Sequence, residues 1–450
     1  MGVADKCLAV LFSTLILGQA YAVRLWVGTW LFPACLFGIF WFAYTFIPLL
    51  LLFPVPVDPY AVAYIFLCTL ALSIGSLPFN WQAAFKANQL KAAAAPPYGN
   101  GYLTTAFNVT ALAALACIAL DLASQGFTAG DVLFDLPTTA ASYANLLYSD
   151  SRNINVFGRL APILGNVAPA LGGLLLHSKS SRFARMWIVT ASFLPAAIVA
   201  VTETTKGLLF FCIATFYAGI LIARLSAGSL QLMNKGARTT IVLYACTVVS
   251  IILAAFLLRG IGNIQDTDVL LGTLVFYIVS YTCGHMYAFA DWFAFAIGRH
   301  SLLVYHDELA RHGLYTFTGF FALLGNDRQL PQGIYDDLYS DGKYLGSNVY
   351  TMFRGLILDF GIPGSLLFML LLGLFFHWVF RILLSRPRPV ASVAMFIFMV
   401  EVFYNSYIVS ALSWTRVYAV LILLCAILQI NKLFNSSGLW FKIRSALKPR

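Results

Sequence analysis

The sequence predicts an all-α polytopic integral membrane protein with about 11 transmembrane helices and a large extracytoplasmic loop domain. Of its 450 residues, 60% are hydrophobic and only 10% are charged. A soluble domain of this length cannot bury that much apolar surface. The apolar residues gather in runs near the length of about 20 residues that a helix needs to cross a bilayer. The distribution of charge then orients the chain.

Eleven apolar runs are expected to span the membrane. They cover residues 7–22, 29–53, 60–78, 103–124, 160–176, 186–202, 207–222, 239–258, 361–380, 389–406 and 415–431. The first run follows Lys6 and ends in Ala20-Tyr21-Ala22, which imitates a cleavable signal peptide. Because only one basic residue precedes it and the next run follows almost at once, we expect the first run to be retained as a span.

The predicted spans divide the chain into four parts. These are residues 1–258 with spans one to eight and a loop near 126–159, the loop domain 259–354, the last three spans in 355–431, and the basic tail 432–450. Residues 270–297 are also apolar enough to span, and a crossing there would invert the chain on one side of it. Their Gly284, His285 and Asp291 suit an interface better than the bilayer centre, so we predict a re-entrant or interfacial segment.

Charge assigns the two sides. Cytoplasmic connections collect Lys and Arg, and the short connections of this chain are purely basic. These connections include the groups Lys179, Arg182, Arg185 and Arg381, Arg386, Arg388. None of the 18 acids then lies on the cytoplasmic side. The net charge of +10 is thereby explained as membrane anchoring, with no nucleic-acid partner. Seven of the 8 cysteines lie in apolar runs, so we expect no disulfide framework.

One junction resembles a known family. The segment GSNVYTMFRGLILDFGIPGSLLFMLLLGLFF resembles the same junction in the Wzy-type O-antigen polymerases, the bacterial oligosaccharide repeat unit polymerases. A basic loop before the fifth span, SDSRNINVFGRLAP, and Thr205-Lys206-Gly207 opening the seventh are similar features. The O-antigen ligases carry a His-Asn pair where this chain has Ser347-Asn348, which favours a polymerase over a ligase.

The resemblance implies a GT-C-like membrane glycosyltransferase of the bacterial inner (cytoplasmic) membrane, with its active site facing the periplasm. Such an enzyme transfers a growing glycan from polyprenyl (undecaprenyl) diphosphate to a lipid-linked repeat unit, without a metal or other cofactor. A chain-length regulator and a flippase are the implied partners. A ligase-like transferase stays an alternative. So does a transporter or flippase of lipid-linked oligosaccharide, although this chain lacks the internal symmetry typical of transporters.

The chemistry of such a donor calls for cations. Departure of a diphosphate leaves negative charge, and Arg binds phosphate oxygens bidentately while staying charged. Six cations are expected at the outer interface: Arg152, Arg159, Lys206, Arg259, Arg354 and Arg416. Each alone fits a snorkelling anchor, but the positive-inside bias makes six together unusual. We rank Arg152, Arg159 and Arg354 as catalytic, and Lys206 and Arg259 as substrate-binding. Arg416, beside Trp414, suits an anchor best.

A general base must also take the acceptor's proton. His306 is one candidate, and we expect it to lie near His312 on a helix, which in itself suits an ordinary amphipathic helix. Glu401, inside a predicted span, is another; its alternative role is to neutralise a buried Arg.

The remaining candidates bind substrate or are structural. Asn348, Tyr350 and Asp359 are candidate substrate-binding residues, although Asp359-Phe360-Gly361 also suits a cap of the ninth helix. Outer aromatic residues can stack on sugar rings. We expect no metal in the reaction; a calcium site at Asp336, Asp337 and Asp341 that only stiffens the loop is the alternative.

Overall fold

The computed structural model describes residues 2–92, 98–148, 155–203, 207–233, 238–257, 264–307, 312–325 and 335–436. The chain is about 78% helical, which confirms the all-α class. Nine helices of the described residues are long and apolar enough to cross a membrane, so the polytopic character is confirmed as well. The extracytoplasmic loop domain stays a prediction.

The chain forms two compact units, each built from three stretches of sequence. The first unit comprises Met1–Ala87, Leu271–Ser385 and Glu401–Tyr418. The second comprises Asn88–Leu270, Arg386–Val400 and Ala419–Arg450. Because the predicted domains followed chain order, they did not anticipate this interleaving of the two halves.

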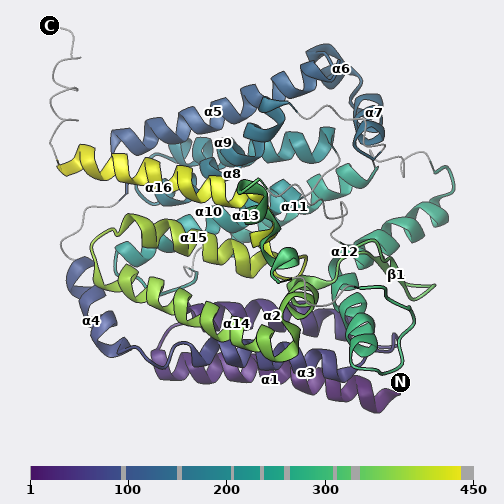
Figure 1. The fold of residues 1–450 in the computed structure, drawn as a ribbon. Coiled ribbons are helices and arrows are strands. Elements are labelled where there is room, and N and C mark those ends of the chain that lie inside the picture. The colour runs from purple at the N-terminus through teal and green to yellow at the C-terminus, as the bar shows by residue number, and fades with distance from the viewer. Residues whose placement is uncertain are drawn as a thin grey trace, which may run out of the picture. The chain divides into compact units, whose positions relative to one another are not determined.

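Four helices form the framework of the first unit. They are α1 (Val3–Val27), α2 (Pro33–Leu51), α3 (Pro59–Ile74) and α14 (Thr351–Ser385). Helix α1 packs against α2 and α3, and α14 packs against α3 (Figure 1). The α3–α14 contact depends on small residues, since a Cβ added to Gly373 would overlap the carbonyl oxygen of Leu72. Close backbone approach of this kind stabilises helix pairs in a membrane, where burial of apolar surface cannot.

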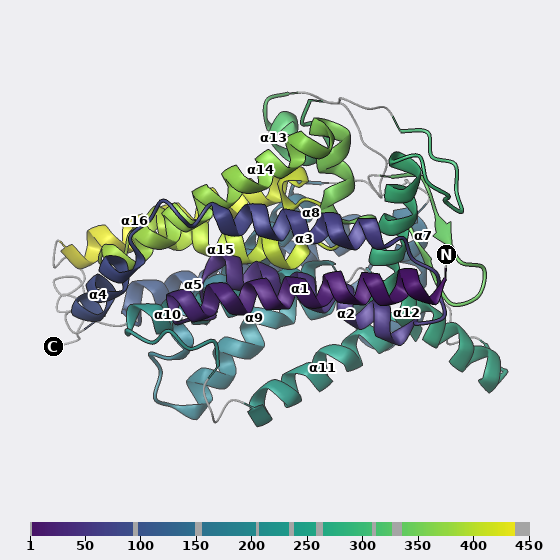
Figure 2. The ribbon, with the colours of Figure 1, turned by 90° about the horizontal axis from the view of Figure 1, so that it is seen from below.

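Helix α12 (Thr267–Ala296) is one continuous helix of 30 residues, which excludes the re-entrant form of the prediction for 270–297. Its His285 Nε2 lies 3.0 Å from the carbonyl oxygen of Tyr44, and the Tyr287 hydroxyl donates to that of Leu52 (2.8 Å). Lys6 Nζ, at the start of α1, donates to the same Leu52 carbonyl (3.0 Å). The second half of α12 therefore contacts the end of the bundle where α1 begins and α2 ends (Figure 2). Because α12 is also long enough to span, its interfacial placement stays a prediction.

Between α12 and α14 the described residues are largely irregular. The helix described among them is α13 (Leu314–Leu323). Strands β1 (Tyr339–Ser340) and β2 (Gly346–Ser347) form a two-residue antiparallel hairpin. One Asp341 carboxylate oxygen accepts the backbone N–H groups of residues 343, 344 and 345 at 3.0, 2.8 and 3.0 Å, which fixes the turn.

Helix α14 is interrupted at Gly361, whose φ of 67° and ψ of 176° are not helical. The predicted ninth span begins at this break. Ten residues of helix, from Thr351 to Phe360, precede it. This short segment carries both Arg354 and Asp359.

The second unit is a bundle around α8 (Val156–Leu176). Helix α8 contacts α5 (Gly101–Ser124), α9 (Arg182–Thr202) and α10 (Gly207–Ser226). Helix α11 (Arg238–Leu257) contacts α9. The predicted loop near 126–159 contains two short helices, α6 (Ala129–Phe134) and α7 (Leu136–Tyr148). Helices α4 (Trp81–Ala92), α15 (Val390–Asn405) and α16 (Thr415–Ser436) complete the described helices.

We expect the hairpin to face the periplasm. Lys343, exposed beside the turn, should react as Lys343→Cys with a membrane-impermeant thiol reagent in spheroplasts, because the hairpin follows a segment predicted not to cross. The measurement requires Cys7→Ser and Cys246→Ser, since these two free thiols are exposed.

Arg182→Cys is the control. Arg182 is exposed at the start of α9, in a connection predicted to be cytoplasmic, and should react only after lysis. Reaction of both cysteines from the same side would contradict the orientation and would mean that α12 crosses the membrane.

Candidate functional site

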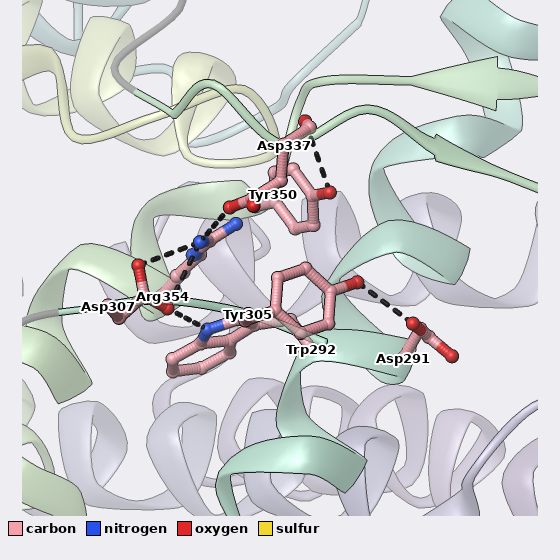
Figure 3. Close-up of polar contacts among 7 residues, drawn as sticks. All are labelled: Asp291, Trp292, Tyr305, Asp307, Asp337, Tyr350 and Arg354. Atoms are coloured by element: carbon pink, nitrogen blue, oxygen red, sulfur yellow. Dashed lines mark hydrogen bonds and ion pairs between the residues drawn. The ribbon is translucent and has the colours of Figure 1, made fainter. Parts of the chain in front are cut away.

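Arg354, on the first helical segment of α14, is fully buried. Its Nη2 donates to both carboxylate oxygens of Asp307 (2.8 and 3.0 Å) and to Asp337 Oδ2 (2.5 Å) (Figure 3). The two acid side chains are 14% and 28% exposed. A guanidinium removed from water is stable only when paired with anions and hydrogen-bonded, so these carboxylates hold Arg354 in place.

Four aromatic rings enclose the guanidinium. Its Cζ lies 4.1 Å from the ring centroid of Tyr335, 4.3 Å from that of Tyr350, 5.1 Å from that of Tyr305 and 5.4 Å from that of Trp292. Burial raises the pKa of Tyr350 to about 12 and raises those of Tyr305 and Tyr335 as well. All three phenols are therefore neutral, and they stabilise the cation through their ring faces.

Hydrogen bonds fasten the loops that supply these groups. Trp292 Nε1, on α12, donates to Asp307 Oδ2 at 2.5 Å. Asp291 accepts the N–H of Leu302 (2.6 Å) and the hydroxyl of Tyr305 (2.9 Å). The Tyr350 hydroxyl donates to the carbonyl oxygen of Asp337 (3.2 Å) (Figure 3). The end of α12 thus positions the chain that follows it, so that one carboxylate from each loop reaches Arg354.

The arginine retains unused donors. Arg354 Nε and Nη1 are buried and have no hydrogen-bond partner in the structure, and the same holds for the Tyr335 hydroxyl. A buried donor left unpaired costs about 1 to 3 kcal/mol, which points to an acceptor that a ligand would supply. With one cation and two carboxylates the cluster carries a net charge of −1 (1 − 2 = −1). Arg354 Nη2 is thus engaged by the two carboxylates, and its Nε and Nη1 remain for a ligand.

A small cavity with several polar side chains in a largely apolar lining adjoins this cluster. It has a volume of about 140 Å³. Its lining includes Asp58, Tyr287, Asp291, His300 and Tyr339. Asp58 also forms an ion pair with Arg299, whose Nε lies 2.6 Å from Asp58 Oδ2. Because Asp291 both lines the cavity and holds Tyr305, the cavity and the aromatic enclosure share a wall.

The approach of the other predicted cations to Arg354 stays untested. Arg152, Lys206 and Arg259 lie outside the described residues. Arg159 is exposed on α8 of the second unit. The expected ring of cations thus stays a prediction.

The histidine prediction is partly wrong. His306 is exposed and precedes Asp307, but residues 301–307 are not helical. His312 lies in a turn with a φ of 54°. Because His306 is not in a helix, the two histidines do not share one.

Asp359 caps a different helix from the one expected. Its carboxylate accepts the N–H groups of Tyr315 (3.2 Å) and Thr316 (2.7 Å) and the Thr316 hydroxyl (2.6 Å). These groups open α13, where the first N–H groups lack helical partners. Asp359 therefore connects α14 to α13 instead of capping α14. Asn348 is exposed just before Tyr350.

Glu401 is buried near the end of α15, and its Oε1 has no hydrogen-bond partner in the structure. Its two predicted roles, as a general base or as the partner of a buried Arg, both stay predictions. Arg416 Cζ lies 5.0 Å from the ring centroid of Trp414, the contact expected of an anchor.

Sequence reasoning did not identify Trp292, Asp307, Tyr335 and Asp337 as parts of one site. Asp307 and Asp337 lie 47 and 17 residues before Arg354. No spacing rule connects residues across irregular loops of that length.

We expect Arg354→Met to destabilise the protein by about 3 kcal/mol, because it leaves two carboxylates facing each other without their cation. Adding Asp307→Asn and Asp337→Asn should recover most of that loss. Unfolding midpoints of the detergent-purified variants measure both effects. Arg381→Met, which removes an exposed arginine of the same helix, should change stability by less than about 0.5 kcal/mol. Equal losses for Arg354→Met with and without the two Asn substitutions would contradict the ion-pair account.

No family model, no curated protein and no solved structure matches this chain.

Proposed function

We propose that this chain is a membrane glycosyltransferase, a polymerase that transfers a growing glycan from polyprenyl diphosphate to a lipid-linked repeat unit. The observation that supports this proposal most is the buried Arg354, which has unpaired N–H donors beside two partly exposed carboxylates. A cation for the leaving group and a carboxylate for the nucleophile are the two functions that this transfer needs.

The leaving group is the first requirement. As the bond between the anomeric carbon and the diphosphate oxygen breaks, negative charge develops on that oxygen. Arg354 Nε and Nη1 are not used in its pairing with Asp307 and Asp337. They would donate hydrogen bonds to that oxygen and stabilise its charge. Arg152, Arg159, Lys206 and Arg259 remain proposed as further cations for the diphosphate, which carries more charge than one guanidinium neutralises.

Activation of the nucleophile, the acceptor hydroxyl, is the second requirement. We assign the base to Asp337, because its side chain is 28% exposed and only its Oδ2 is bonded to Arg354. The acceptor hydroxyl would give its proton to this carboxylate, its oxygen would bond to the anomeric carbon, and the diphosphate would leave with the bonding electron pair. His306 stands beside Asp307 and is exposed, so it remains the alternative base.

Sugar recognition is the third requirement. Neutral tyrosines and the cavity beside Asp291 would offer ring faces and hydrogen-bond acceptors to a glycan. The segment that resembles the repeat unit polymerases contains Tyr350, Arg354, Asp359 and Gly361. These are the residues that build the cluster and the break in α14, which also supports the proposal.

A transporter or flippase of lipid-linked oligosaccharide is the second candidate. One observation favours it: α14 is interrupted at Gly361, and transporters bind substrates at interrupted helices. A transferase forms a new glycosidic bond, whereas a transporter leaves its substrate unchanged. The product of the reaction therefore separates the two functions.

The first functional prediction is chain extension by the purified protein. Given lipid-linked repeat units extracted from the source cells, it should produce a ladder of longer glycans. Arg354→Lys keeps the charge but loses the guanidinium donors, so extension should slow by about 10²-fold or more. Arg299→Lys, the same change in the Asp58 ion pair, should extend chains at nearly the wild-type rate. Wild-type speed in Arg354→Lys would make Arg354 purely structural, and unchanged substrate with wild type would favour the transporter.

The second functional prediction is that extension needs no divalent metal. The carboxylates of Asp307 and Asp337 are engaged by Arg354, and Asp341 caps the hairpin turn, so a metal would have to displace these contacts. Extension in excess EDTA should proceed at an undiminished rate. Loss of extension that magnesium or manganese specifically restores would overturn the arginine mechanism.

A further inference from the structure

The second unit contains a larger cavity that the proposed reaction does not use. Its volume is about 280 Å³. Its lining comprises Tyr98, Pro387, Arg388, Val390, Val393, Leu428, Asn431 and Lys432. All these residues belong to the second unit. They come from the segment before α5, the turn into α15 and the last turns of α16.

Arg388 is turned into this cavity. Its Nε and Nη2 are buried and have no hydrogen-bond partner in the structure, and its Cζ lies 4.8 Å from the Tyr98 ring centroid. Burial lowers the pKa of this guanidinium. The residue also has a φ of 46°, a left-handed conformation that costs a residue with a side chain about 1 to 2 kcal/mol. Arg388 thus combines a strained backbone with unpaired donors, and an anion in the cavity would stabilise it.

The remaining walls are of two kinds. Lys432 is exposed at the cavity and adds a second positive charge. Val390, Val393 and Leu428 form an apolar side. Asn431 is buried, and its side-chain oxygen accepts a hydrogen bond from Asn100, which connects the end of α16 to the start of α5. The cavity thus offers two cations beside an apolar wall.

We propose that this cavity binds the phosphate headgroup of an anionic phospholipid. Arg388 binds the phosphate through its unpaired donors, Lys432 neutralises the headgroup, and the valines and Leu428 contact the start of an acyl chain. Basic cavities between transmembrane helices suit anionic lipids in this way. A free phosphate would use the two cations but not the apolar wall. The nearby connections are those predicted to face the cytoplasm, so the lipid belongs to that leaflet.

The test measures lipid binding by the purified full chain in detergent. Phosphatidylglycerol should raise the thermal unfolding midpoint of the wild type and remain bound in native mass spectrometry, whereas phosphatidylcholine and inorganic phosphate should do neither. Arg388→Gln should weaken phosphatidylglycerol binding by about tenfold or more, since hydrogen bonds to a charged group contribute about 1.5 to 3 kcal/mol each. Arg381→Gln removes an exposed arginine of α14 that does not line the cavity, and this variant should bind as the wild type does.

A second variant tests the apolar wall and does not alter charge. Val390→Phe fills part of the cavity and should also weaken phosphatidylglycerol binding about tenfold. If Arg388→Gln fails to fold, the binding of Val390→Phe tests the lipid site. Undiminished binding in either folded variant would overturn the proposal. Equal losses in Arg381→Gln and Arg388→Gln would mean a general surface attraction. Equal stabilisation by inorganic phosphate would replace the lipid with a free anion.

Discussion

The buried charge of Arg354 is the constraint on which the first unit's loop region depends. Taking a guanidinium out of water costs several kcal/mol unless anions and hydrogen bonds replace the solvent. Asp307 and Asp337 meet that requirement from two separate loops, and Trp292 holds Asp307 from α12. A single side chain at the start of α14 therefore determines where irregular segments far apart in the sequence must lie.

Much of the fold could be predicted from composition, because the membrane makes hydrophobicity a nearly sufficient signal for helices. The continuous helix α12 could not be predicted in this way. Its polar residues suggested a re-entrant or interfacial segment, yet His285 is satisfied by the Tyr44 carbonyl and Asp291 by the N–H groups that follow the helix. Hydropathy registers that a residue is polar but not whether a distant partner satisfies it. The interleaved units likewise depend on contacts between segments far apart in the chain.

Only part of the candidate site was predictable. Arg354 stood out because the positive-inside bias disfavours a cation at the outer interface, and Tyr350 stood out as an outer aromatic residue that could bind a sugar. Its anionic partners come from irregular loops, which leave no periodic trace in the sequence, so a carboxylate that neutralises Arg354 looked like any exposed acid. Asp359 was expected to cap the start of the ninth span. Its carboxylate instead caps the start of α13, which is distant in sequence and close in space.

The break at Gly361 has a consequence for how such a protein can evolve. With φ at 67°, this position separates the short segment that bears Arg354 and Asp359 from the long apolar helix that follows. The apolar part can change its residues, length or tilt without turning the cation away from its partners. Selection would then act on a few polar positions and one glycine, while most of the chain exchanges one apolar residue for another. Ancestry in such a protein fades from the overall sequence long before the local geometry changes.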